Sequence, residues 1–167
     1  MRKGFNRYGS LISIISISII LLDQVAKRLV QTKMALFQSV PVIKNVLHIT
    51  YIRNSGAAFG ILRGKQGFFL FTTIIALVLI FSYIRELKEN NTLSALALAL
   101  ILGGALGNFL DRVFYGFVVD FIEVKINFPL FNIADSAIVI GIILIFVESF
   151  FKKKIQNTDD ENIVKED

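Results

Sequence analysis

Four long apolar runs limit what this chain of 167 residues can fold into. They cover about residues 8–26, 67–84, 92–110 and 135–151. A helix needs ~20 mostly apolar residues to cross the hydrocarbon core of a bilayer, and each run is close to that length. Hydrophobic residues make up 54% of the sequence and the mean hydropathy is +0.66, which is well above the composition of ordinary soluble domains. The sequence therefore predicts a membrane α-helical fold, a bundle of four transmembrane helices.

The first run also has the basic start and apolar centre of a cleaved signal peptide. No small-residue cleavage site follows it, only the residues Leu21–Gln24, so we expect the run to be retained as a helix. Four spans then place both termini on one side of the membrane. Lysine and arginine divide equally between the two sides, so their number does not fix the orientation. The basic N-terminus and the cluster Lys152–Lys154 favour termini on the cytoplasmic side.

The residue types that are missing exclude several kinds of site. The chain has no cysteine and a single histidine, His48. Disulfides, thiolate ligands, a cysteine nucleophile, a histidine-based triad and a multi-histidine metal site are therefore not expected. The formal charge of +5 suits a protein that touches anionic membrane lipids. We expect no nucleic-acid partner, because no basic helix and no interleaving of basic and aromatic residues occurs outside the tails.

Residues 31–66 form a connection that is too long for a simple turn. Residues 46–53 are rich in β-branched and aromatic side chains, which predicts a strand, and His48 within it is expected to be structural. The residues Asn54–Gly56 supply turn chemistry, and the small side chains of residues 57–60 would allow close approach to a membrane or to another backbone. We therefore expect residues 31–66 and 112–132 to form a small β-sheet and a loop on the membrane surface.

Small residues repeat every four positions along the third run, at Ala95, Ala99, Gly103 and Gly107. Small residues let helices approach closely in a membrane, so we expect this helix to be central in the bundle. The series ends in Asp111, which we expect to be structural. The neighbouring row has the same spacing and consists of Gly104, Asn108 and Arg112. Asn108 fits a structural role and a role in a site equally well, whereas Arg112 fits an interfacial cap better.

Beyond residue 112, apolar residues recur at every second position, which predicts a strand. Asp120 falls on the apolar face of that strand, where desolvation should raise the pKa of its carboxyl group. The alternative is a turn aspartate that precedes the strand. The first interpretation makes Asp120 a candidate catalytic residue.

Asn132 and Asp135 lie where the fourth run begins. Asn132 suits the N-cap of a helix, and Asp135 falls at the third helical position, where an acidic side chain interacts favourably with the helix dipole. Local sequence alone therefore favours a capping role for Asp135. If Asp120 lies across from it, the two carboxyl groups can instead act as an acid and a base.

Asp23 and Lys27 lie four residues apart near the end of the first run, with the acid before the base, the better order for a helical ion pair. The pair is either purely structural or part of a polar wall beside a site. A neighbouring carboxylate keeps a lysine charged, so Lys27 is a poor candidate for a catalytic base.

Five short motifs, in this order among four spans, resemble the bacterial lipoprotein signal peptidase (signal peptidase II) family. They are D-Q-V-A-K (23–27), N-S-G-A-A-F (54–59), G-N-F-L-D-R (107–112), V-V-D-F (118–121) and F-N-I-A-D (131–135). The resemblance covers residues 8–151. We expect residues 1–151 to form a single membrane peptidase domain and residues 152–167 to form a polar cytoplasmic tail.

The resemblance implies an aspartic endopeptidase of the bacterial cytoplasmic membrane, with its active site at the extracytoplasmic face beneath a β-sheet cradle and a loop. Its substrate would be a diacylglyceryl-modified prolipoprotein, cleaved just before the lipid-bearing cysteine, and globomycin-type peptides would inhibit it. The residues that match the family's catalytic dyad are Asp120 and Asp135. The residues that match its surrounding polar positions are Asp23, Lys27, Asn54, Gly56, Asn108, Arg112 and Asn132. We expect no metal, no other cofactor, and a monomer in contact with membrane lipids.

Three other functions fit parts of the sequence. A small transporter or channel would spread its polar residues through the depth of the bilayer, whereas the aspartates here fall at span ends on one side. A scaffold without chemistry would use the aspartates as caps and ion pairs, so Asp135→Asn would be almost silent. A serine–lysine peptidase needs a serine opposite Lys27, and no serine is clearly placed there.

Overall fold

A computed structural model describes residues 3–56, 61–62, 64–87, 91–126 and 128–166. These residues form four helices and three strands. The helices are α1 (Lys3–Lys33), α2 (Gln66–Glu86), α3 (Thr92–Tyr115) and α4 (Ile133–Glu166). The strands are β1 (Ser39–Ile43), β2 (Leu47–Asn54) and β3 (Val118–Val124). Each predicted span lies inside one of the helices, and the described residues contain four segments that are long and apolar enough to cross a membrane.

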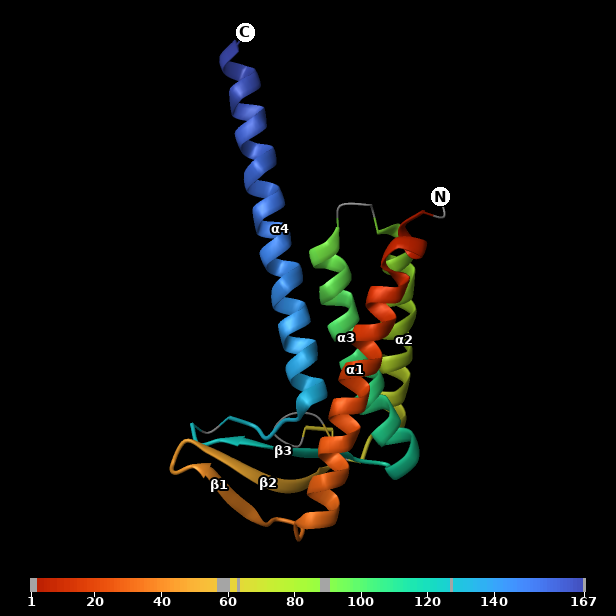
Figure 1. The fold of residues 1–167 in the computed structure, drawn as a ribbon, viewed down its shortest axis with the longest axis vertical. Helices are drawn as coiled ribbons and strands as arrows, with labels where there is room; N and C mark the ends of the chain where they lie inside the picture. The colour runs from red at the N-terminus through yellow and green to blue at the C-terminus, as the bar shows by residue number, and fades with distance from the viewer. Residues whose placement is uncertain (1–2, 57–60, 63, 88–90, 127, 167) are drawn as a thin grey trace.

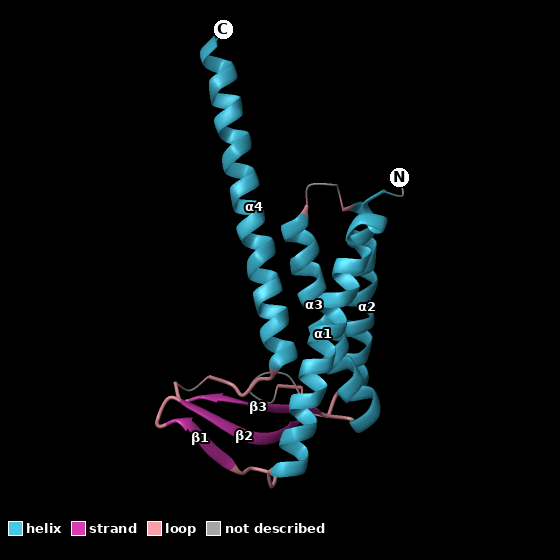
Figure 2. Cartoon of the chain, in the orientation of Figure 1, coloured by secondary structure: helices cyan, strands magenta, loops and turns pink. Residues whose placement is uncertain are grey.

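The helices alternate in direction, so both termini lie at one end of the bundle and the sheet lies at the other (Figure 1). The strands gather beside the C-terminal end of α1 and below the start of α4 (Figure 2). The ends of α1 and α3 and the start of α4 are therefore brought to the same level as the sheet.

Helix α3 is the centre of the bundle, as the small-residue series predicted, because its glycines admit two neighbours. A Cβ atom on Gly103 would lie 2.9 Å from the backbone oxygen of Ser16 in α1. A Cβ atom on Gly104 would lie 2.3 Å from the backbone oxygen of Ala134 in α4. Close packing of this kind fixes the start of α4 against α3.

Two helices are longer at the sheet end than the predicted spans. Helix α3 continues through Arg112 to Tyr115 and ends at Gly116, which has a positive φ of 75° and donates its N–H to the Arg112 oxygen at 3.1 Å. Arg112 and the next three residues are therefore helical, although we expected them in the β region. Helix α1 reaches Lys33, three residues into the predicted connection, because neither glycine nor proline occurs between the end of the apolar run and Lys33.

The polar stretch 152–166, which we predicted as a tail, continues α4 as a helix that projects beyond the rest of the bundle (Figure 1). No glycine or proline occurs in this stretch, so the two strongest helix breakers are missing after the apolar run.

The sheet is antiparallel with the order β1-β2-β3. The strand predicted at residues 46–53 is β2, and it pairs with β3 with His48 opposite Glu123 and Ile52 opposite Asp120. Strand β3 ends at Val124, earlier than the alternation suggested, and the next segment returns to form an isolated bridge between Phe131 and Ile122. The small residues 57–60 lie outside the described residues.

Apolar side chains hold the sheet against the bundle. Val30 of α1, Tyr51 of β2 and the pair Val119 and Phe121 of β3 form one buried cluster. Because residues 119 and 121 are both held in this cluster, the backbone that carries Asp120 between them has little freedom to move.

Candidate active site

Asp120 occupies the middle of β3 and its side chain is 2% exposed. Its Oδ2 accepts a hydrogen bond from Nδ2 of Asn54 at 2.8 Å, and its Oδ1 accepts one from Nδ2 of Asn132 at 2.7 Å. Asn54 is itself held in an Asx turn, because the Gly56 N–H donates to its Oδ1 at 2.9 Å. Asp120 is therefore a strand residue and not the turn aspartate of the alternative interpretation.

The environment of Asp120 favours its protonated form. Burial, together with the nearby charge of Asp135, raises the pKa of the Asp120 carboxyl group to about 7, against the opposing effect of the two amide hydrogen bonds. A carboxyl group with such a pKa can carry a proton near neutral pH, which an ordinary exposed aspartate cannot do.

Asp135 combines the predicted capping role with a contact across the bundle. Its N–H donates to Oδ1 of Asn132 at 2.9 Å, and its Oδ2 accepts from the Asn132 N–H at 3.2 Å, so the two residues cap the start of α4 reciprocally. Its other oxygen, Oδ1, accepts from Nδ2 of Asn108 in α3 at 2.7 Å. Capping therefore uses one carboxylate oxygen and leaves the other directed at α3.

Asn132 connects the two carboxyl groups. It is fully buried, its Nδ2 contacts Asp120, and its backbone N–H contacts Asp135. Asp120 of β3 and Asp135 of α4, which are 15 positions apart in the sequence, are thereby joined through the side chain and the backbone N–H of one residue. This shared partner brings Asp120 and Asp135 into one polar cluster.

A second buried cluster lies behind Asp135 and is centred on Lys27. The three N–H bonds of a lysine ammonium are matched here by three oxygens, those of Asp23 at 2.7 Å, Asp111 at 2.9 Å and Asn108 at 2.9 Å. Asp23 also accepts a hydrogen bond from the Ala134 N–H at 2.9 Å, which ties α1 to the start of α4. Lys27 is thus engaged as a cation, and this environment disfavours its use as a base.

Asn108 joins the Lys27 cluster to Asp135. Its Oδ1 accepts from Lys27, which is a donor only, so the amide must direct its Nδ2 to Asp135. The charge of Lys27 therefore sets the orientation of the donor that holds the Asp135 carboxylate.

Arg112 and Gly56 lie around these clusters. The Arg112 guanidinium lies 4.9 Å from the centre of the Phe69 ring and donates to the backbone oxygen of Asn108 at 3.4 Å. Gly56 is buried in the turn that positions Asn54. Seven of the nine predicted site residues are joined by side-chain hydrogen bonds or ion pairs in two connected clusters. Arg112 supports them by its contact with the backbone oxygen of Asn108, and Gly56 supports them by the turn that holds Asn54.

Two residues in the clusters were not among the predicted site residues. Gln24 donates to Oδ1 of Asp111 at 2.9 Å and to the backbone oxygen of Gly107 at 3.2 Å. Asp111, which we expected to be structural, accepts from Lys27 and from the Val119 N–H at 3.3 Å. The sequence offered one signal for each of these residues. Gln24 directly follows Asp23, and Asp111 stands at the end of the small-residue series.

The chemistry open to the site is that of carboxyl groups and amides. Within the described ranges, no group of three or more His, Cys, Asp and Glu side chains is arranged to hold a metal ion. A buried carboxyl group that can carry a proton, next to a second carboxylate, is suited to acid and base catalysis on a water molecule.

Comparison with known proteins identifies the family. The profile of signal peptidase (SPase) II matches residues 15–151, which is most of the chain. The chain belongs to the signal peptidase II family. It is 50% identical over 140 residues to the lipoprotein signal peptidase of Geobacillus kaustophilus (strain HTA426), which corresponds to 82% of this chain and 91% of that protein.

Two solved structures of bacterial membrane enzymes, determined by the in meso method, have the same fold. The one at 2.3 Å resolution superposes with a TM-score of 0.83 at 41% identity, over 86% of this chain and 90% of that chain. The one at 1.9 Å resolution superposes with a TM-score of 0.77 at 43% identity, over 83% of this chain and 92% of that chain.

These comparisons confirm the predicted family and the predicted fold, four apolar helices with a small three-stranded sheet. They support the function of a lipoprotein signal peptidase, which makes the chain a protease and a membrane protein. The family also implies a lipoprotein substrate.

Proposed function

We propose that this signal peptidase II is an aspartic endopeptidase with Asp120 and Asp135 as its catalytic dyad. The observation that carries the proposal is that one fully buried residue, Asn132, hydrogen-bonds to both carboxyl groups. The negative charge of Asp135 helps to raise the pKa of the Asp120 carboxyl group, so the two groups interact, and this interaction favours a single proton on the pair near neutral pH.

The reaction follows from that shared proton. The Asp135 carboxylate accepts a proton from a water molecule, and the water oxygen forms a bond to the carbonyl carbon of the scissile peptide. Asp120, whose pKa is raised to about 7, donates its proton to the carbonyl oxygen. The tetrahedral intermediate then breaks its C–N bond: Asp135 gives the proton that it took from water to the departing amine, and one hydroxyl of the intermediate returns a proton to Asp120 as the carbonyl group re-forms. No step requires a metal ion or another cofactor.

The proposed substrate is a diacylglyceryl-modified prolipoprotein, cleaved between its signal peptide and the lipid-bearing cysteine. The family and the lipoprotein signal peptidase relative support this substrate class. Position supports it too, because the dyad lies at the sheet end of the apolar helices, where a substrate anchored in the bilayer can reach it. The surrounding residues Asp23, Lys27, Asn54, Gly56, Asn108, Arg112 and Asn132 would orient the dyad and the peptide.

We place the enzyme in the bacterial cytoplasmic membrane, with the sheet and the dyad on the extracytoplasmic side and both termini in the cytoplasm. The cluster Lys152–Lys154 and the basic N-terminus support this orientation. In the same proposal the enzyme acts as a monomer surrounded by membrane lipids, and globomycin-type peptides inhibit it by occupying the dyad.

The test is cleavage of a purified lipid-modified prolipoprotein in detergent by the wild type and by Asp120→Asn and Asp135→Asn. Each variant should fold and lose cleavage by at least about 10³-fold, since each removes a proton acceptor or donor of the reaction. Glu123→Gln is the matched control, because Glu123 lies on the same strand at 18% exposure and pairs with Lys125. It should retain activity, and turnover by either dyad variant at the level of this control would refute the dyad.

A further inference from the structure

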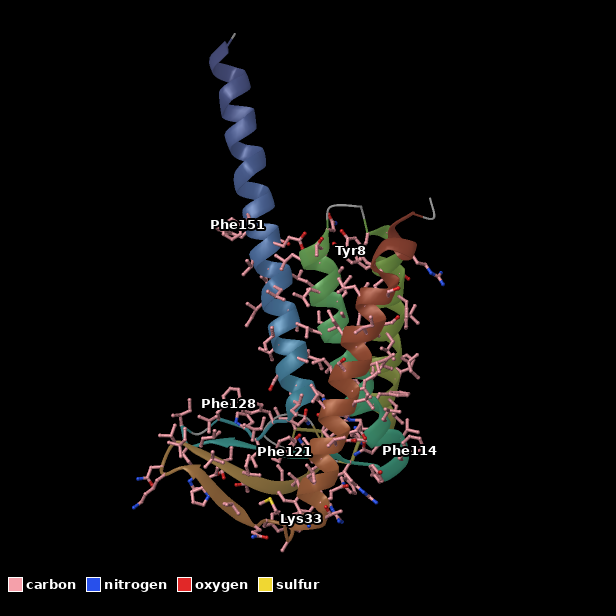
Figure 3. The ribbon with its side chains drawn as sticks, in the orientation of Figure 1. Tyr8, Lys33, Phe114, Phe121, Phe128 and Phe151 are labelled. Atoms are coloured by element: carbon pink, nitrogen blue, oxygen red, sulfur yellow. The ribbon has the colours of Figure 1, made fainter. Side chains whose placement is uncertain are left out.

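A groove of about 310 Å³ lies between α1 and α3, at the ends of these helices that are nearest the sheet. Figure 3 labels Lys33 at the end of α1 and Phe114 near the end of α3. One face of α1 lines the groove with Leu21, Gln24, Val25, Lys27, Arg28 and Gln31. Asp111 and Tyr115 line it from α3. Neither carboxyl group of the proposed dyad lines it, so the groove is separate from the proposed catalytic site.

Three polar side chains at the sheet end of the groove are available to a ligand. Within the described ranges, the side chains of Arg28, Gln31 and Tyr115 make no hydrogen bond and no ion pair. A guanidinium group has five N–H donors, and the amide and the phenol hydroxyl add further donors. A phosphate group, which accepts several hydrogen bonds and binds guanidinium in a bidentate way, matches this set of donors.

The charge of the groove wall favours an anion. Of its three charged side chains, Lys27 and Asp111 pair with each other at 2.9 Å, and Arg28 is left over. Both carboxylate oxygens of Asp111 are engaged, Oδ1 by Gln24 and Oδ2 by Lys27. Asp23, the second partner of Lys27, is fully buried and does not line the groove. The amine of a zwitterionic headgroup would therefore meet no free carboxylate among the described residues of this wall.

The polarity of the groove changes along α1 in the way that a phospholipid requires. Leu21 and Val25 lie in the membrane-spanning part of α1 and are 58% and 57% exposed. Leu21 is about 10 Å further from the sheet end of α1 than Arg28, since a helix rises ~1.5 Å per residue. Tyrosine, present here as Tyr115, is enriched at the boundary between a bilayer and water. A headgroup at Arg28 would thus leave its acyl chains beside Leu21 and Val25.

We propose that this groove binds the phosphate headgroup of an anionic phospholipid from the leaflet on the sheet side of the membrane. Arg28 holds the phosphate, and Gln31 and Tyr115 donate to its other oxygens. Gln24, in the same wall, donates to Asp111, so the bound lipid packs against the Lys27 cluster. The lipid should raise the unfolding temperature, because the groove exists only when α1 and α3 are packed together.

The experiment measures binding of dioleoyl phosphatidylglycerol and of dioleoyl phosphatidylcholine to the purified protein in detergent by native mass spectrometry. The two lipids have the same acyl chains and differ in headgroup charge. The wild type should prefer phosphatidylglycerol, and Arg28→Gln should lower this preference by about fivefold, the effect of one cation on an anionic lipid. Lys33→Gln is the matched control, because it removes one charge from an exposed position on the same helix outside the groove. It should keep the wild-type preference.

A second pair of variants tests the part of the groove that would hold the acyl chains. Val25→Trp fills the groove without changing its charge and should weaken phosphatidylglycerol binding. Leu29→Trp is the control, because Leu29 is 55% exposed on the same helix and does not line the groove. It should bind phosphatidylglycerol as the wild type does, and equal binding by the two tryptophan variants would overturn the placement of the chains.

Three results would overturn the site as a whole. The first is equal affinity of the wild type for the two lipids. The second is an unchanged preference in Arg28→Gln, or an equal loss in Lys33→Gln. The third is an affinity for inorganic phosphate as high as that for phosphatidylglycerol, which would identify a site for free anions. The site does not depend on the proposed function, so Asp135→Asn should bind both lipids as the wild type does, and a lost preference in this variant would place the lipid at the dyad instead.

Discussion

At the scale of single residues, the unusual group is Asp120, a carboxyl group in a part of β3 that is buried on both faces. Its neighbours Val119 and Phe121 lie on the opposite face, in the apolar cluster that holds the sheet against the bundle, and its two hydrogen-bond partners are the neutral amides of Asn54 and Asn132. Neutral amides stabilise a carboxylate less than a cation would, so desolvation dominates and the pKa rises.

This pKa gives a prediction for the pH dependence of cleavage. With the Asp120 pKa at about 7, the proton of the dyad is present below that pH and is lost as the pH rises through it. We therefore expect kcat/KM of the wild type to decline above pH of about 7, and to decline again in acid when both carboxyl groups are protonated. The measurement is kcat/KM against pH with a substrate that does not itself titrate in the range. A rate that stays constant from acid to alkaline pH would contradict a shared proton.

Lys27 gives a second prediction at this scale. Lys27→Met would leave the carboxylates of Asp23 and Asp111 buried without their cation, which costs about 3–5 kcal/mol in comparable buried pairs. Thermal unfolding in detergent measures the loss. Lys125→Met is the matched control, since Lys125 pairs with Glu123 at 36% exposure and should contribute about 1 kcal/mol or less. Equal effects of the two substitutions would show that the Lys27 cluster does not stabilise the fold.

At the scale of elements, the site depends on how closely α4 approaches α3. Helix α4 carries Asp135 at its first turn, α3 carries Asn108, and their hydrogen bond of 2.7 Å requires the two backbones to be close. Gly104 allows this approach, because any side chain there would meet the Ala134 backbone oxygen, one residue before Asp135.

The third prediction concerns this contact. Gly104→Ala should force α4 away from α3, destabilise the protein by about 1–3 kcal/mol and lower kcat. Gly67→Ala in α2 is the control, because no atom lies within 4 Å of the Cβ it would add. Thermal unfolding and single-turnover cleavage of both variants check the prediction. A Gly104→Ala variant as stable and active as Gly67→Ala would mean that the close approach is not required.

At the scale of the whole molecule, the fold consists of a bundle of helices able to span a membrane, with the β-sheet at one end of the bundle. Both termini lie at the end of the bundle that is opposite the sheet (Figure 1). The proposed orientation therefore places the sheet and the dyad together outside the cytoplasm and places both termini inside it.

Absence of cysteine from the sequence makes a fourth prediction easy to test. Lys44→Cys, in the turn between β1 and β2, should react in intact cells with a maleimide that cannot cross the cytoplasmic membrane. Lys152→Cys should react only after the membrane is permeabilised. The reverse labelling pattern would show that the chain has the opposite orientation.

The sequence predicted the elements of the fold from local patterns. The four spans, the strand at residues 46–53, the central position of α3 and the cap of α4 by Asn132 were predicted from hydrophobic runs, β-branched residues, small residues and cap residues, and the structure contains each of them, with the strand at 47–54. Element ends were predicted less well, because α1 and α3 continue past their apolar runs and β3 stops at Val124, where the chain turns back to form the bridge to Phe131.

The sequence by itself determined that this chain crosses a membrane and that its polar motifs fall at span ends on one side, because hydrophobicity and capping are properties of neighbouring residues. Only the tertiary structure decided which polar groups meet. The contacts of Asn132 with Asp120, of Asn108 with Asp135, and of Lys27 with Asp111 join separate elements. They depend on the close packing of α3 with α1 and α4 and on the register of β2 with β3, and no local pattern specifies those distances.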